Sequence, residues 1–88
     1  EDLISSGKSS LAAVEAIRNE DLNVRGLLSI FTYSFEEADK NFKKYNCIKN
    51  SLCDYKTLIN EALKSNYIQN KDVEVLEQWR NDPKNWPV

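Results

Sequence analysis

Apolar residues recur at helical spacing through most of this chain. The most regular stripe has successive intervals of 4, 3, 4, 3, 4 and 3 residues and consists of Val24, Leu28, Phe31, Phe35, Ala38, Phe42 and Tyr45. Side chains at these intervals lie on one face of an α-helix. The pattern therefore predicts a long core helix over residues 24–45, which should end at Tyr45 because Lys49 holds the next position of the stripe. An S-x-x-E capping sequence at Ser34 leaves open a break near Tyr33.

Three shorter helices are expected around this one. Their apolar positions are Leu11, Val14 and Ile17; Tyr55, Leu58, Ile59, Ala62 and Leu63; and Val73, Leu76 and Trp79. Their expected N-caps are Ser9 or Ser10, then Ser51 with Asp54, then Asp72. The last helix should end by Asp82, because proline at position 83 disfavours helical conformation before it. With two glycines, two prolines and no Asn-Gly or Asp-Gly pair, a hairpin sheet is not indicated. We predict an all-α fold, a compact single domain of about four short helices over residues 1–88.

The charge of the chain is low overall but uneven. Twelve basic and fourteen acidic side chains give a net charge of −2, which provides no electrostatic footprint for nucleic acid. Residues 40–64, however, carry six lysines against two acids. The candidate surface for a partner is therefore this basic segment together with an aromatic in the tail: Lys40, Lys43, Lys44, Lys49, Lys56 and Trp86. A solvated helix face is the simpler explanation of the lysines.

The segment "SSGKSS" contains the last three letters of a phosphate-binding loop at Gly7, Lys8 and Ser9. The first glycine of that motif would fall on Asp2, whose carboxylate would repel a phosphate, and a strand would have to fit into the six residues before Gly7. The sequence therefore favours a flexible polar N-terminal segment over a phosphate site.

Catalytic residue sets are poorly represented. The chain has no histidine, so a Ser-His or Cys-His pair cannot form, and two cysteines alone cannot complete a zinc site. The acidic pairs Glu36/Glu37 and Glu74/Glu77 are expected on solvated helix faces. We predict no enzymatic activity, no metal and no cofactor.

Cys47 and Cys53 are the two cysteines of the chain. In one unbroken helix, residues six apart are separated by roughly 9 Å along the axis, whereas a disulfide needs Cα atoms within about 7 Å. A bridge is therefore compatible with the sequence if the helix ends between them, and Asn46, Asn50 and Ser51 favour a turn there. We predict a disulfide at a helix–helix corner, with two free thiols as the alternative.

The chain starts at Glu1, has no methionine and has no apolar run long enough to cross a membrane. A mature secreted chain has such a start after removal of a signal peptide. Together with the predicted disulfide, this start favours a secreted, extracellular monomer that contacts no membrane.

Along its whole length, from "EDLISSGKSSLAAVEAI" through "YNCIKNSLCDYKTLINEALK" to "WRNDPKNWPV", the chain resembles the salivary anti-complement proteins of New World sand flies, small secreted proteins of blood-feeding insects. This resemblance implies a non-catalytic inhibitor of the host classical complement pathway, used in immune evasion. The implied partner is an early complement component in host plasma.

Two alternatives remain at this stage. A small helical carrier of apolar or amine ligands, resembling the odorant-binding proteins of insects, would use the Phe-rich stripe to line a cavity, although such carriers are longer and have three bridges. A toxin-like channel ligand would need a denser disulfide framework than two cysteines allow.

Overall fold

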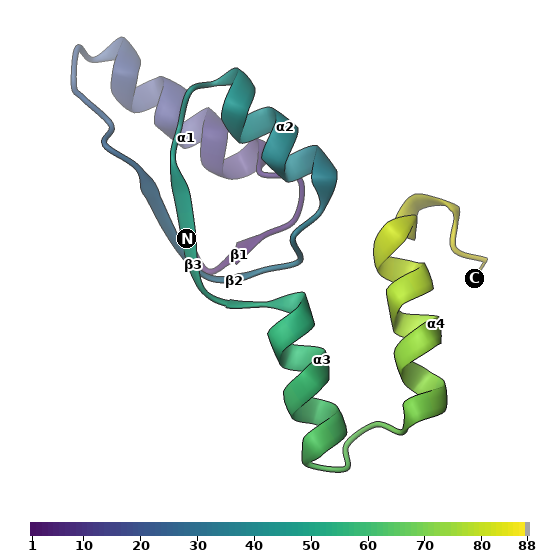
Figure 1. The fold of residues 1–88 in the computed structure, drawn as a ribbon. Helices are drawn as coiled ribbons and strands as arrows, with labels where there is room; N and C mark the ends of the chain where they lie inside the picture. Colours follow the sequence, from purple (N-terminus) through teal and green to yellow (C-terminus); the bar gives the residue numbers. More distant parts are fainter. Residues whose placement is uncertain (88) are drawn as a thin grey trace. The chain divides into compact units, whose positions relative to one another are not determined.

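A computed structural model describes residues 1–87 (Figure 1). The elements, in chain order, are β1 (Leu3–Ile4), α1 (Lys8–Asn19), β2 (Leu27–Thr32), α2 (Glu36–Lys44), β3 (Lys49–Asp54), α3 (Tyr55–Lys64), α4 (Asn70–Asn81) and a 3₁₀ turn at Pro83–Asn85. The chain divides into two compact units, residues 1–54 and the residues from 55 onward. Whether they act as one domain, as predicted for residues 1–88, stays a prediction. No helix within residues 1–87 is both long and apolar enough to span a bilayer.

The first unit contains a three-stranded sheet with the order β1-β2-β3. Both pairings are parallel, with Leu3 opposite Phe31 and Ser29 opposite Ser51. Each strand is followed by a helix, so the unit has a repeating β-α order. The all-α prediction is therefore wrong, because the protein has an α/β fold.

The long helix predicted over residues 24–45 is replaced by a strand, a turn and a helix. The segment Leu27–Thr32 reads LLSIFT, and periodicity alone cannot distinguish a short apolar run in a strand from one in a helix. Isoleucine, phenylalanine and threonine favour the strand. Ser34 then adopts a left-handed conformation with φ of 59°, and α2 begins after Phe35, which is its N-cap. The break near Tyr33 is confirmed, but Ser34 is not the cap.

The predicted helix end at Tyr45 is confirmed. Tyr45 is the C-cap of α2, and Asn46 follows in the left-handed conformation with φ of 51°. The Cys47 amide donates to the Phe42 carbonyl at 2.9 Å, and the Asn46 amide donates to the Lys43 carbonyl at 3.1 Å. This pair of bonds is a Schellman motif, which satisfies the last carbonyls of the helix.

The core of the first unit lies between the sheet and the two helices α1 and α2. Its buried residues are Ile4, Leu11, Val14, Ala38, Phe42 and Cys47, with Val24, Leu27 and Tyr45 packed against them. Figure 1 shows both helices on the same side of the sheet. This arrangement follows from the right-handed crossovers that connect β1 to β2 and β2 to β3.

The second unit is a pair of helices, α3 and α4. Tyr55 begins α3 and is buried; its hydroxyl donates to the Leu76 carbonyl at 2.9 Å, and its ring stacks on Trp79 with 5.8 Å between centroids. Gln69 is the N-cap of α4, and Asp72 completes a capping box. Both helices were predicted, whereas Asp72 acts three residues into α4 and is not its N-cap.

The predicted disulfide is absent, because Cys47 and Cys53 are both free cysteines. The turn at Asn46 does form, but the chain then runs into β3 instead of turning back. A strand rises about 3.3 Å per residue, so residues 49 and 53 alone are roughly 13 Å apart, which exceeds the reach of a disulfide. Cys47 belongs to the core and is 8% exposed, and Cys53 lies within β3.

Both thiols should therefore react when the protein is unfolded without a reductant. We expect two thiols per chain in denaturant. In the native state we expect Cys53 to be labelled faster than Cys47, because Cys47 is more deeply buried. Labelling followed by peptide mass spectrometry measures both. Finding no reactive thiol in unreduced, denatured protein would show that the two sulfur atoms are bonded.

Candidate functional site

The loops that follow β1 and β2 lie at one edge of the parallel sheet. Residues 5–7 connect β1 to α1, and residues 33–35 connect β2 to α2. The carboxyl ends of parallel strands meet at the same edge, and open α/β sheets bind their ligands there. This edge is therefore the first place to look for a site (Figure 1).

The turn from β1 into α1 depends on Gly7. Its backbone is left-handed, with φ of 84° and ψ of 2°, and it serves as the N-cap of α1. A Cβ atom placed on Gly7 would lie 2.5 Å from Cε2 of Phe42 and 3.1 Å from its Cδ2. Both the conformation and the lack of space therefore require glycine here.

The same turn is held by hydrogen bonds on either side. The Asn41 side-chain amide, on α2, donates to the Ser6 carbonyl at 2.9 Å. The Leu11 amide donates to the Gly7 carbonyl at 2.9 Å, which starts the helix. Hydrogen bonds to both α1 and α2 therefore hold the turn between Ser5 and Lys8 in this conformation without a ligand.

The N-terminus of α1 carries no acidic residue in its first turn, and its N-cap Gly7 has no side chain that could accept from its amides; the Lys8 amide donates to the Ser6 hydroxyl at a long 3.4 Å. In α2, by contrast, Glu36, Glu37 and Asp39 fill the first turn. The exposed amides of a helix N-terminus bear a partial positive charge. In α2 this charge is matched by the helix's own carboxylates, whereas α1 has none in its first turn, and the Glu1 carboxylate that reaches this turn accepts from the Ser10 hydroxyl.

Hydroxyl and ammonium groups surround the α1 terminus. Ser5, Lys8 and Ser9 are exposed. The Lys8 ammonium lies 3.9 Å from a carboxylate oxygen of Glu37, with 77% of the Lys8 side chain exposed. A weak surface pair of this kind leaves the lysine able to turn toward a bound anion. A phosphate site has this combination: a strand, a glycine turn and a helix N-terminus, with hydroxyl groups and a lysine beside it.

Two of the features expected to exclude such a site are not as the sequence predicted. A strand does precede the turn, because β1 occupies Leu3–Ile4 and the Glu1 and Asp2 carbonyls also accept hydrogen bonds from β2. Asp2 belongs to this extended segment, roughly 10 Å along the chain from Ser5 at about 3.3 Å per residue. Its carboxylate therefore does not occupy the turn. The Gly7-Lys8-Ser9 signal was present, but so short a strand was not recognised.

Glu1 is tied to the first turn of α1. The Ser10 hydroxyl is 3% exposed and donates to Oε2 of Glu1 at 2.8 Å. Ser10 is a candidate N-cap in the sequence, but it lies inside the helix and contacts Glu1 instead. This bond joins the residues before β1 to α1 beside the turn.

An aromatic cluster lies at the end of β2. The Tyr33 and Phe35 rings are stacked, with centroids 5.2 Å apart and an interplanar angle of 6°. Phe31 meets Tyr33 edge-on at 5.2 Å. The Ser34 amide donates to the Thr32 hydroxyl at 3.1 Å, which supports the left-handed turn between the two stacked rings. The helical stripe assigned Phe31 and Phe35 to a helix face, so this cluster was missed.

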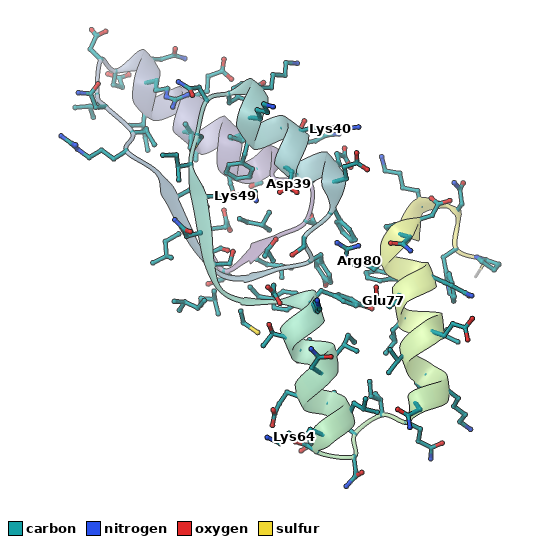
Figure 2. All side chains as sticks on the ribbon, in the orientation of Figure 1. Asp39, Lys40, Lys49, Lys64, Glu77 and Arg80 are labelled. Atoms are coloured by element: carbon teal, nitrogen blue, oxygen red, sulfur yellow. The ribbon has the colours of Figure 1, made fainter. Side chains whose placement is uncertain are left out.

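The predicted lysine surface is only partly brought together. Lys49 lies 2.7 Å from the Asp39 carboxylate and 5.8 Å from the centroid of the Phe42 ring, and Lys40 lies 3.4 Å from Glu36 (Figure 2). Lys40, Lys43 and Lys44 lie on α2, Lys56 lies on α3 in the other unit, and Trp86 is half-buried after the 3₁₀ turn. A partner-binding role for these six residues stays a prediction.

No protein-family profile matches the chain. Curated relatives do match it along its length. The orotate phosphoribosyltransferase of Porphyromonas gingivalis is 44% identical over 88 residues, which is all of this chain and 42% of the relative. The orotate phosphoribosyltransferases of Enterococcus faecalis and Phocaeicola vulgatus are 45% and 46% identical over 86 residues, which is 98% of this chain and 41% of each relative. The chain thus spans about two fifths of the length of these relatives.

These relatives overturn the functional expectations from the sequence. They are named as transferases, so the similarity to sand-fly salivary proteins is wrong, and so are complement inhibition and the alternative of an odorant-binding-like carrier. The prediction of no enzyme is wrong for the same reason. The expected plasma partner is wrong as well, because these relatives are named as phosphoribosyltransferases and not as complement-binding proteins. The resemblance rested on overall likeness and on a disulfide that does not form. The extracellular location stays a prediction.

Proposed function

We propose that this chain forms the phosphate-holding part of an orotate phosphoribosyltransferase. The observation that carries the proposal is the α1 N-terminus, a helix end with no acid in its own first turn, behind a glycine turn at the carboxyl edge of a parallel sheet. A phosphoribosyl group carries a phosphate ester, which is the kind of anion that such a terminus binds. The relatives' shared name supports this assignment, since they match the chain over 98% or more of its length.

In this proposal each part of the turn has a defined task. The left-handed Gly7 turns the chain from β1 into α1 and, because it has no Cβ, lets this turn pack against the Phe42 ring. The first amides of α1 donate hydrogen bonds to the phosphate oxygens, because they have no intrahelical carbonyl partner. The Ser5 and Ser9 hydroxyls add donors, and Lys8 adds a positive charge. These residues bind and orient the phosphate; they do not break or form its bonds.

Replacing Ser9 with aspartate tests the proposal. The new carboxylate would stand in the first turn of α1, as Glu36 and Glu37 do in α2, and would compete with a phosphate for the same amides. We expect the affinity for ribose 5-phosphate, measured by isothermal titration calorimetry, to fall at least tenfold, equivalent to about 1.4 kcal/mol. The melting temperature should hold or rise, because an acid near a helix N-terminus stabilises it by about 0.3–1 kcal/mol.

The matched control is Asn70→Asp, which adds the same charge to the first turn of α4. This variant should bind ribose 5-phosphate like the wild type. Loss of binding together with a lower melting temperature in Ser9→Asp would mean only that the helix was damaged. The proposal is wrong if the wild-type chain does not bind ribose 5-phosphate, or if both variants lose affinity equally.

A further inference from the structure

One hydrogen bond to the β1–α1 turn comes from α2. The Asn41 side chain lies half-buried on that helix, and its amide donates to the Ser6 carbonyl at 2.9 Å. Figure 1 shows α1 and α2 side by side on the sheet. Asn41 is therefore placed to act on the turn from a second helix, without belonging to the turn itself.

This hydrogen bond sets the direction of one peptide unit. The Ser6 carbonyl and the Gly7 amide belong to the same planar unit, and no peptide bond within residues 1–87 is cis. In a trans unit the C=O and N–H bonds point in opposite directions. Because the Ser6 carbonyl points to the Asn41 side chain, the Gly7 N–H points away from it.

The Gly7 amide is not used inside the chain. Within residues 1–87 it donates no hydrogen bond, although Gly7 is a buried residue. Buried backbone N–H groups are nearly always paired, because an unpaired one costs free energy. An acceptor for this amide has to come from outside the described chain, and a phosphate oxygen is an acceptor of the required kind.

The position of α2 is fixed close to Asn41. The Arg18 guanidinium, in the last turn of α1, donates to the carbonyls of Tyr45 and Asn46 at the end of α2, the second at 3.1 Å. Tyr45 lies four residues after Asn41, which is roughly 6 Å along the helix axis. With α2 tied to α1 at this distance, the Asn41 amide is held beside Ser6.

We propose that Asn41 is a positioning residue of the phosphate site, which directs the Gly7 amide toward the bound phosphate by holding the Ser6 carbonyl. Asn41 does not touch the phosphate and acts through the Ser6–Gly7 peptide unit. Glycine tolerates both orientations of the peptide before it. A flipped unit would present the Ser6 carbonyl oxygen to the anion in place of the Gly7 N–H. This inference rests on the proposed function, since it assigns a role in the same site.

Asn41→Leu tests the positioning role. Leucine is similar in size, adds no charge and cannot donate to Ser6. We expect the affinity for ribose 5-phosphate, measured by isothermal titration calorimetry, to fall about tenfold, as for the loss of one charge-assisted hydrogen bond. At saturating ribose 5-phosphate, the Gly7 amide signal of the ¹⁵N-labelled variant should shift less than in the wild type. The Ser9 amide, which belongs to another peptide unit, should shift as in the wild type.

Two controls separate positioning from a general loss of stability. Asn60→Leu makes the same replacement at an exposed position of α3. Val14→Ala removes buried methyl groups and so lowers stability, but Val14 is roughly 10 Å along α1 from Gly7. Both controls should bind ribose 5-phosphate like the wild type. Circular dichroism shows whether each variant is folded, and Asn41→Ala replaces Asn41→Leu if the leucine variant is not.

The outcomes distinguish this inference from the proposed function. If the wild-type chain binds ribose 5-phosphate and the folded Asn41 variant binds it equally well, the positioning role is wrong and the phosphate site stands. The role is also wrong if Val14→Ala weakens binding as much, or if the Gly7 and Ser9 signals lose their shifts to the same extent. If the wild-type chain does not bind ribose 5-phosphate, the proposed function fails and the role of Asn41 fails with it.

Discussion

Replacement of Gly7 by alanine is expected to destabilise the first unit by about 2–5 kcal/mol. An L-residue held in the left-handed conformation costs about 1–2 kcal/mol, and Gly7 has φ of 84°. The new Cβ would also lie 2.5 Å from the Phe42 ring, and overpacking of this kind costs about 1–3 kcal/mol. Urea unfolding followed by circular dichroism measures the change in the free energy of unfolding.

Gly26→Ala provides the matched control for this change. A Cβ at Gly26 would lie 3.3 Å from the Ile48 carbonyl oxygen, and the backbone there is not left-handed. We expect its free energy of unfolding to stay within about 1 kcal/mol of the wild type. Equal effects of the two alanines would contradict the assigned geometry of the β1–α1 turn.

Truncation of Phe42 to alanine is expected to cost about 3–5 kcal/mol. Its ring is 2% exposed and is among the largest fully buried side chains of the core. Removing a buried phenylalanine loses its transfer free energy and leaves a cavity, which together give this range. Because a chain of this length has a total stability of only about 4–13 kcal/mol, the variant should be partly or wholly unfolded at 37 °C.

Two comparisons make the Phe42 prediction specific. Leu22→Ala, at a position 61% exposed, should change the free energy of unfolding by less than about 0.5 kcal/mol. In a Phe42→Ala background, Gly7→Ala should cost only the conformational part, about 1–2 kcal/mol, because the ring that it would strike is gone. Strictly additive costs in the double variant would argue against contact between Gly7 and Phe42.

Local patterns in the sequence were sufficient to predict three helices and the C-terminal end of a fourth. α1, α3 and α4 lie where the apolar spacing predicted them, and α2 ends at Tyr45 with Asn46 left-handed. These features depend on contacts within a few residues. The spacing of side chains and the tolerance of asparagine for positive φ determine them locally.

The sheet could not be predicted in the same way. Each strand pairs only with strands distant in sequence, and β1 spans two residues. The spacing of Leu28 and Phe31 fits a helix as well as a strand. A β-branched, aromatic-rich run such as LLSIFT was the one signal for β2. Once that strand was taken for a helix, the disulfide at a helix corner followed from the same error.

The sequence contains the motif of the candidate site, but the motif alone cannot be distinguished from a chance occurrence of the same three residues. Gly7-Lys8-Ser9 occurs in many chains, and its meaning here depends on a strand before it and on the Phe42 ring behind the glycine. The absence of acids from the first turn of α1 becomes informative only beside α2, whose first turn holds three. The lack of histidine was wrongly taken to exclude an enzyme. Phosphate binding uses backbone amides and does not require histidine.

The most direct test of the proposed function is a titration of the ¹⁵N-labelled chain with ribose 5-phosphate, followed by amide NMR. We expect the largest shifts on the amides of Gly7, Lys8 and Ser9. Inorganic phosphate should move the same amides, and ribose alone should move none of them. The proposed function is contradicted if these three amide signals do not shift, if ribose shifts them as far, or if the shifts instead fall on the lysines of α2.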